Sequence, residues 1–167
     1  MFRDPPGVKH VNLGKYQRQI RDLLENLADG PLETFGIVRQ PLDWMGSWYR
    51  CRQRDQLKGH KNSTHGIAFD EFLMSYMSDD RPHCARVVDQ ARFYKPRPND
   101  KPIDHLFQYE QLDHAVAFLE NRLGRTFHLP HKNVSPKIDL PVSDDNYRAF
   151  LGYAADQYTV WNSAHRQ

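Results

Sequence analysis

Apolar residues recur along the chain mainly at the spacing of one helix face. This pattern predicts helices at about residues 12–27, 42–54, 69–76 and 112–124, and a last helix that Ser143 caps. Two short apolar runs, at residues 35–38 and 103–109, favour strands. Strands that alternate with helices indicate an α/β domain with a parallel sheet flanked by helices.

The apolar faces of the first and last helices predict which side chains enter the core. In the first helix this face comprises Leu13, Tyr16, Ile20, Leu23, Leu24 and Leu27. In the last helix it comprises Tyr147, Phe150, Leu151, Ala154, Tyr158 and Trp161. We expect both faces to be buried.

One strand leads directly into a segment with the chemistry of an anion site. Arg39 follows the predicted strand, and Pro41 stands at a plausible first position of the next helix, where its missing N–H costs nothing. Ser47 lies on the polar side of that helix, with Asp43 and Arg50. A helix start attracts anions through its backbone N–H groups and its dipole, and an arginine can bind a phosphate with two parallel hydrogen bonds. The segment therefore predicts a strand–turn–helix anion site.

The same segment resembles a known family. Arg39, Pro41, Ser47 eight residues after the arginine, and the nearby Tyr49 are similar to the 3′-phosphate-binding segment of sulfotransferases. Those enzymes use 3′-phosphoadenosine 5′-phosphosulfate (PAPS) as their sulfate donor. The resemblance implies that Arg39 and Ser47 bind the 3′-phosphate of this cofactor. The alternative is a surface arginine at a strand end and a helix serine that bind no ligand.

The second half of the chain extends the resemblance. The sequence Tyr109-Glu-Gln-Leu112 after the second strand resembles the family's Tyr-Glu-x-Leu mark, and residues 131–135 resemble its Asn-x-Ser stretch. Together these similarities span most of residues 8–161. They imply a sulfotransferase fold of the P-loop-containing nucleotide hydrolase type.

One part of the family pattern is not found in this sequence. Sulfotransferases hold the 5′-phosphosulfate with a loop of the type Pro-Lys-x-Gly-Thr-Ser/Thr that follows a first strand. The first lysine here, Lys9, has neither a preceding strand nor a neighbouring pair of hydroxyl residues. We therefore expect residues 1–167 to form a single sulfotransferase-like domain that is truncated at its N-terminal edge and inactive at this length. If such a strand and loop are encoded in frame upstream of Met1, the translation start of this sequence was assigned too late.

Two further residues are assigned to the site by the resemblance. His10 stands before the first helix, near the place where many family members carry a catalytic histidine, and it is the candidate base for the acceptor. Lys132 is a candidate ligand of the nucleotide. The alternatives are an exposed loop histidine and a solvated loop lysine.

Composition and charge narrow the remaining function classes. The 167 residues carry a formal net charge of +2, which permits anionic ligands but does not indicate a nucleic-acid-binding protein. No apolar run of membrane-spanning length is present, so we expect no membrane association. Cys51 and Cys84 favour reduced thiols in a cytoplasmic protein, and the nine histidines include no helical metal-binding pair, so no metal is assigned.

The sequence thus predicts transfer of a sulfuryl group from PAPS to a hydroxyl or amine of a small-molecule or carbohydrate acceptor. We expect the acceptor pocket to draw on the 56–66 loop and on the region of Trp44 and Trp48. A second hypothesis is a remnant domain that binds a nucleotide or a partner without catalysis. A third is a kinase-type phosphotransferase, for which the chain shows no Gly-x-x-x-x-Gly-Lys-Ser/Thr loop.

Overall fold

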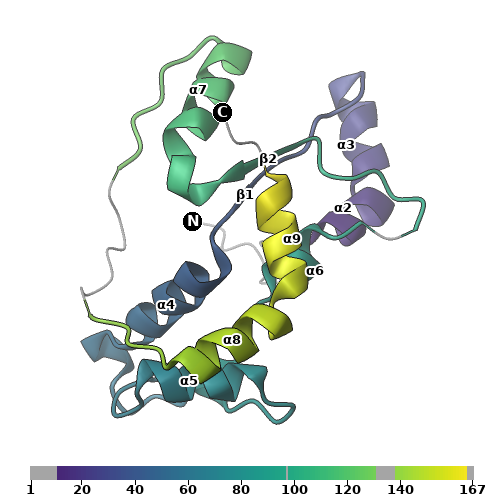
Figure 1. Ribbon diagram of the computed structural model, residues 1–167. Helices are drawn as coiled ribbons and strands as arrows, with labels where there is room; N and C mark the ends of the chain where they lie inside the picture. The colour runs from purple at the N-terminus through teal and green to yellow at the C-terminus, as the bar shows by residue number, and fades with distance from the viewer. Residues whose placement is uncertain (1–10, 97, 131–137, 165–167) are drawn as a thin grey trace.

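A short parallel sheet lies among helices in the computed structural model, which describes residues 11–96, 98–130 and 138–164 (Figure 1). The described elements are α2 (Leu13–Gln19), α3 (Arg21–Ala28), β1 (Phe35–Val38), α4 (Pro41–Arg52), η1 (Asp55–Leu57), α5 (Phe69–Met77), η2 (His83–Ala85), α6 (Gln90–Tyr94), β2 (His105–Gln108), η3 (Tyr109–Gln111), α7 (Leu112–Leu123), α8 (Asp144–Tyr153) and α9 (Ala155–Ser163).

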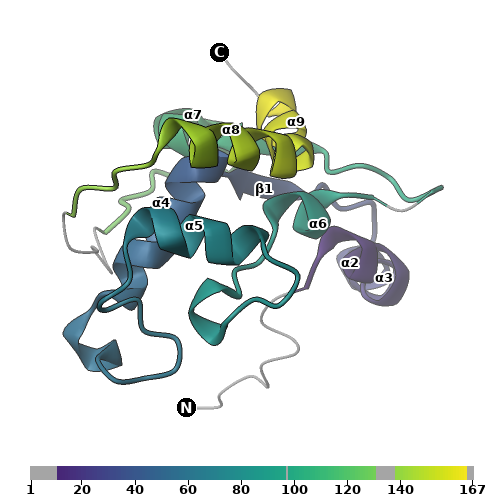
Figure 2. The same ribbon diagram turned by 60° about the horizontal axis from the view of Figure 1, so that its bottom comes forward.

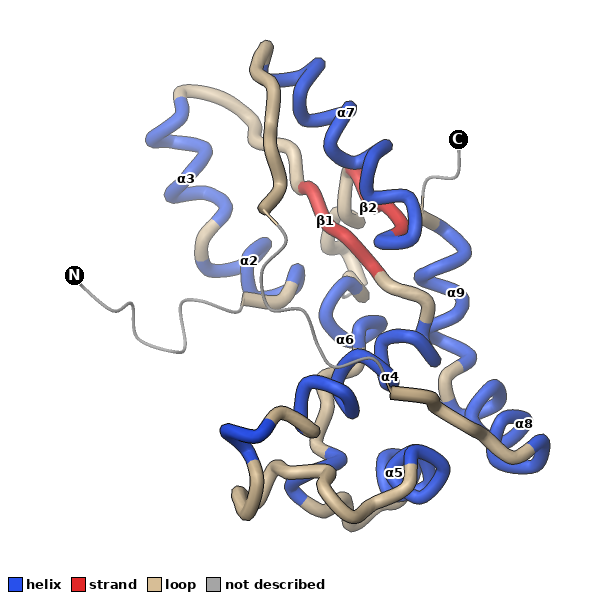
Figure 3. The backbone as a smooth tube through the Cα atoms, turned by 90° about the vertical axis from the view of Figure 1, so that its left-hand side faces the viewer, coloured by secondary structure: helices blue, strands red, loops and turns tan. Residues whose placement is uncertain are grey.

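Strands β1 and β2 pair in parallel, with Phe35 opposite His105 and Val38 opposite Gln108. The protein is therefore an α/β structure, as the alternation of strands and helices predicts, although most of the described residues in regular elements are helical. Helix α7 packs on β2, and the sheet runs between α7 on one side and α3 on the other (Figures 1 and 3). Because the strands are parallel, both of their carboxyl ends meet at one edge of the sheet.

Tyr94 closes part of the outer edge of β1. Its hydroxyl donates a hydrogen bond of 2.6 Å to the carbonyl oxygen of Ile37. This contact requires Gly36, since a Cβ atom there would lie 2.7 Å from the Tyr94 ring and 2.7 Å from Ile103. An edge strand whose carbonyl is bound by a side chain is less open to pairing with another strand.

The largest group of buried apolar side chains lies where α4, α5 and α8 meet (Figure 2). Met45, Phe72, Tyr76 and Phe150 are completely inaccessible to solvent there. Tyr49 of α4 and Phe69 and Leu73 of α5 belong to the same core, and Trp44 and Trp48 pack against it. This core fixes the direction of α4, and with it the polar face of α4 that carries Ser47.

The first predicted helix is divided in two. Asn12 caps α2 by accepting a hydrogen bond from the Lys15 N–H at 2.8 Å, but the backbone leaves helical geometry at Ile20, with φ at −125°. Helix α3 then buries none of its residues, and Leu23 and Leu27 are 62% and 75% exposed. The prediction that the whole leucine face is buried is wrong, because the break at Ile20 turns α3 away from the elements that α2 contacts.

The last predicted helix is also divided, at Ala154, into α8 and α9. Ser143 does cap α8, since its hydroxyl accepts a hydrogen bond from the Asn146 N–H at 3.4 Å. Phe150 and Ala154 are buried as predicted, whereas Tyr147 and Leu151 are about two-fifths exposed. The bend at Ala154 points α9 back toward the sheet, where Trp161 and Val160 pack beside Val38 and Leu106.

No helix in the described part of the chain is both long enough and apolar enough to cross a bilayer.

Candidate functional site

The candidate site lies where β1 and β2 end side by side. Arg39 and Gln40 follow β1, and Tyr109 and Glu110 follow β2. The register that pairs Val38 with Gln108 therefore brings the two pairs of residues together. The carboxyl ends of parallel strands are the usual place for ligand sites in α/β proteins.

Arg39 and Ser47 are in direct contact, as their sequence pattern predicts for one binding site. The Nη1 atom of Arg39 donates a hydrogen bond of 3.1 Å to the Ser47 hydroxyl oxygen. Pro41 is the first residue of α4, also as predicted. The Cα atoms of Arg39 and Ser47 are thus about two helical turns apart in sequence, and the long Arg39 side chain spans this separation. The Arg39 side chain is 20% exposed, which leaves its guanidinium accessible from solvent.

Asp43 lies beside both arginines of this polar face. Its carboxylate accepts a short hydrogen bond from the Arg39 Nε–H, and its other oxygen is 3.4 Å from Nη2 of Arg50. Asp43, Ser47 and Arg50 thus share one side of α4, as helical spacing predicts. The two arginines are held by a single carboxylate.

Two elements distant in sequence hold Arg39 in place. The side-chain oxygen of Gln90 accepts a hydrogen bond of 2.9 Å from the Arg39 N–H, and the side-chain nitrogen of Gln90 donates one of 2.8 Å to the Arg39 carbonyl. On the other side the Arg39 guanidinium lies over the Tyr109 ring, 4.4 Å from its centroid, in a cation–π contact.

The start of α4 differs from the prediction of an open helix N-terminus. The Gln40 N–H donates to the Glu110 carboxylate at 2.7 Å, and the Asp43 N–H donates to the Gln40 side chain at 2.8 Å. Pro41 has no N–H. These donors already have partners within the chain, so an anion at this site depends on the side chains of Arg39 and Ser47 rather than on the helix start.

Glu110 also ties the site to the last helix. Its second oxygen accepts a hydrogen bond of 3.0 Å from the Trp161 ring N–H, and the Gln40 side chain donates to the Tyr158 hydroxyl at 3.2 Å. Sequence reasoning connected Glu110 to the family mark but not to Gln40, and it missed Gln90 altogether. Residues 81–92 carry no clear periodicity, so no pattern there indicates a contact to Arg39.

The two other predicted site residues, His10 and Lys132, lie outside the described residues. Two residues of the expected acceptor region, Trp44 and Trp48, lie in the described part of the chain. Trp44 and Trp48 pack edge to face, with ring centroids 5.7 Å apart, and both rest against the core of α4, α5 and α8. The Trp44 ring N–H donates to the Val88 carbonyl at 3.1 Å. These contacts are those of packing residues.

A cavity of about 580 Å³ adjoins Tyr109. Leu112, Val116 and Phe127 give it apolar walls, and Asp113 and Glu120 add carboxylates. Tyr109 therefore contacts the Arg39 guanidinium and also lines a space large enough for a small organic ligand.

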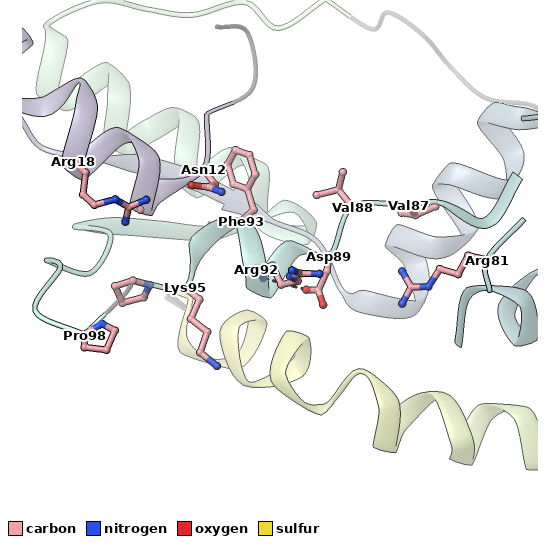
Figure 4. A pocket seen from close by; sticks show the side chains of 12 residues that line it. Asn12, Arg18, Arg81, Val87, Val88, Asp89, Arg92, Phe93, Lys95 and Pro98 are labelled. Carbon is pink, nitrogen blue, oxygen red and sulfur yellow. Dashed lines mark hydrogen bonds between the residues drawn. The ribbon is translucent and has the colours of Figure 1, made fainter. Parts of the chain in front are cut away.

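A second cavity, of about 650 Å³, carries more positive charge but does not include Arg39 or Ser47 (Figure 4). Arg18, Arg81, Arg92 and Lys95 line it and are spread along its length in the figure. Three of them interact within the chain. Arg18 lies 3.4 Å from Asp100, Lys95 lies 3.6 Å from Asp156, and Arg81 binds the hydroxyl of Tyr153. Asp100 and Asp156 offset two of the four positive charges, and the cavity lacks the Arg39–Ser47 contact, so we place the candidate site at Arg39.

Comparisons of this chain with protein-family models, with curated proteins and with solved structures found no match.

Proposed function

We propose that this chain is a sulfotransferase-like protein that binds a 3′-phosphorylated adenosine nucleotide of the PAPS type through Arg39 and Ser47. The observation that carries the proposal is the 3.1 Å contact between the Arg39 Nη1 and the Ser47 hydroxyl oxygen. These residues come from a strand end and from the second turn of the helix that follows. Their contact supports a common ligand for both.

The donors in the site suit a phosphate. A guanidinium has five N–H groups, and Asp43 and Ser47 engage two of those of Arg39 in the described structure. The remaining groups can bind a phosphate, and the Ser47 hydroxyl can donate to a second phosphate oxygen. Gln90 and Tyr109 fix the position of Arg39, which lowers the entropy lost on binding.

The cavity beside Tyr109 supports the nucleoside part of the proposal. Its apolar walls suit the faces of a base, and Asp113 and Glu120 can accept hydrogen bonds from an exocyclic amine or a ribose hydroxyl. In this arrangement Tyr109 stands between the phosphate and the base.

The bound donor would supply an activated sulfuryl group, and a hydroxyl or amine of a small molecule or carbohydrate would accept it. In this proposal Arg39 and Ser47 bind the 3′-phosphate, and the sequence contains no Pro-Lys-x-Gly-Thr loop for the 5′-phosphosulfate. This observation favours a second candidate function, in which the protein binds the nucleotide without transferring sulfate.

Isothermal titration calorimetry separates binding from its absence. We expect adenosine 3′,5′-bisphosphate to bind, and adenosine 5′-monophosphate to bind at least tenfold more weakly, because only the first carries the 3′-phosphate. Equal affinities for the two nucleotides, or no heat with either, would refute the proposal. Transfer of radiolabelled sulfate from PAPS to a set of phenols, amines and sugars then distinguishes an enzyme from a binding protein.

A further inference from the structure

We propose that Arg50 is a third ligand of the same phosphate and that Asp43 is an internal anion that the phosphate displaces. The inference rests on the proposed function at Arg39 and Ser47. It adds a residue that belongs to neither the Arg-x-Pro pattern nor the serine position. It also predicts which charge state of a phosphate the site selects.

The geometry around Asp43 carries the proposal. One carboxylate oxygen is bound by the Arg39 Nε–H, and the other is 3.4 Å from the Arg50 Nη2. The Arg39 and Arg50 side chains are 20% and 21% exposed, whereas Asp43 is 41% exposed. The two arginine side chains are therefore covered to a greater extent than the carboxylate between them. An anion that arrives from solvent meets Asp43 first and can replace it on both arginines.

Arg50 folds back along α4 toward Asp43 and passes beside Gly46. A Cβ atom at Gly46 would lie 2.5 Å from a methyl group of Leu140 and 3.5 Å from the Arg50 Nη1. Only the distance to Leu140 would be a clash, and 3.5 Å is an ordinary van der Waals contact, so the Arg50 guanidinium lies beside Gly46, one turn before its own Cα atom, without depending on the glycine. This arrangement directs its charge at the start of the helix, where Arg39 lies.

The balance of charge favours a ligand with two negative charges. Two guanidinium groups share one carboxylate, and the carboxylate of Glu110, which follows β2, is bound to the Gln40 N–H and the Trp161 ring N–H instead. A terminal phosphate is largely a dianion at neutral pH, and a phosphate diester is a monoanion of similar shape. We expect the site to bind the dianion more tightly, because it supplies the charge that the two arginines lack.

A simpler interpretation is that Arg50 and Asp43 form an ordinary surface ion pair. Pairs of this kind contribute little, and the 3.4 Å separation is long for a strong one. In that case removal of Arg50 would leave phosphate binding unchanged.

The first test uses the unmodified protein and two ligands. Adenosine 3′-monophosphate carries the dianion, and its methyl ester carries a single charge at the same place. We expect titration calorimetry to give at least a tenfold lower Kd for the dianion. Equal Kd values would overturn the proposal without any question of folding.

The second test uses Arg50→Gln, with Arg148→Gln on the exposed surface of α8 as the matched control for loss of one positive charge. We expect Arg50→Gln to raise the Kd for adenosine 3′,5′-bisphosphate about 10- to 100-fold, the range for hydrogen bonds to charged groups. It should also remove most of the preference for the dianion over the methyl ester, which a merely structural role would not change. Arg148→Gln should stay within about twofold of the unmodified protein.

The third test is Asp43→Asn, which keeps the shape of the side chain and removes its charge. We expect the Kd to fall severalfold, because the phosphate no longer competes with a carboxylate. A rise in Kd would show that Asp43 positions Arg39 instead of competing with the ligand. The failures are distinguishable: wild-type affinity in Arg39→Ala refutes the proposed function, whereas wild-type affinity in Arg50→Gln alone refutes the role of Arg50.

Discussion

The side chain of Gln90 and the backbone of Arg39 exchange two hydrogen bonds, of 2.9 and 2.8 Å. The Gln90 amide thus binds Arg39 as the backbone of a neighbouring strand would. Gln90 is 6% exposed and begins α6, whereas Arg39 is the first residue after β1. The buried amide satisfies both the N–H and the carbonyl of Arg39 just where the sheet ends. The position of the Arg39 guanidinium therefore depends on a residue 51 positions away.

Substitution of Gln90 by alanine is expected to lower the free energy of unfolding by about 2–3 kcal/mol, because two hydrogen bonds are lost and their backbone partners remain partly buried. Urea denaturation followed by circular dichroism measures the change. Gln56→Ala, at an exposed position in η1, is the control and should stay within about 0.5 kcal/mol. A Gln90→Ala protein as stable as the control would mean that the amide contributes no net stability.

Arg39→Ala is expected to weaken the binding of adenosine 3′,5′-bisphosphate by about 1.5–3 kcal/mol, and Ser47→Ala by about 0.5–1.5 kcal/mol, because the first removes a charged donor and the second a neutral one. Titration calorimetry provides both values. Adenosine 5′-monophosphate serves as the control ligand, and its weak binding should not change in either variant. Unchanged affinity for the bisphosphate in Arg39→Ala would count against the whole site.

Gly36→Ala and Gly152→Ala are expected to change stability in opposite directions. At Gly36 the new methyl group would lie 2.7 Å from the Tyr94 ring, so the ring must move from the Ile37 carbonyl, at a cost of about 1–3 kcal/mol. At Gly152, inside α8, the structure has no atom within 4 Å of the new methyl group. Alanine there should add about 0.5–1 kcal/mol through helix propensity. Thermal denaturation measures both variants, and a Gly36→Ala protein as stable as the unmodified one would contradict this account of Gly36.

The contact between Thr34 and Asp104 predicts a loss of stability in acid. Burial raises the pKa of Asp104, but hydrogen bonds from Lys101 and from the Thr34 N–H and hydroxyl outweigh it, and the pKa lies at about 2 instead of 3.8. A carboxyl whose pKa is lowered on folding stabilises the protein above its ordinary pKa, and this contribution disappears as the pH falls from about 4 to 2.

This carboxylate contributes about 1–2 kcal/mol to the free energy of unfolding. The value is smaller than the pKa shift alone would give, because Lys101 is half exposed and its charge is screened. Asp104→Asn measures it. The difference in unfolding free energy between the unmodified protein and this variant should be largest at neutral pH and should shrink below pH 4. A difference that is constant from pH 7 to pH 2 would show that the carboxylate charge has no part in it.

The local elements of the site could be predicted because neighbouring residues determine them. An apolar run predicts β1, Pro41 marks the first turn of α4, and helical spacing places Asp43, Ser47 and Arg50 on one face. The contact between Arg39 and Ser47 follows from these features, since a strand end and the next helix are joined by a single short turn.

The contacts that complete the site come from distant segments. The prediction of open N–H groups at the start of α4 failed because Glu110, 70 residues from Gln40, occupies one of them. The predicted burial of the leucine face of the first helix is wrong at Leu23 and Leu27 for a related reason. Periodicity shows which side of a helix is apolar, but it does not show whether another element covers that side.

The sequence by itself determined the alternation of strands and helices and the one segment in which a strand, an arginine, a proline and a serine follow in order. Only the tertiary structure decided the register of β1 on β2, which sets Tyr109 and Glu110 beside Arg39 and Gln40. The physical reason is that local patterns act through a few neighbouring residues. Pairing of strands and burial of faces depend instead on side chains brought together from the whole chain.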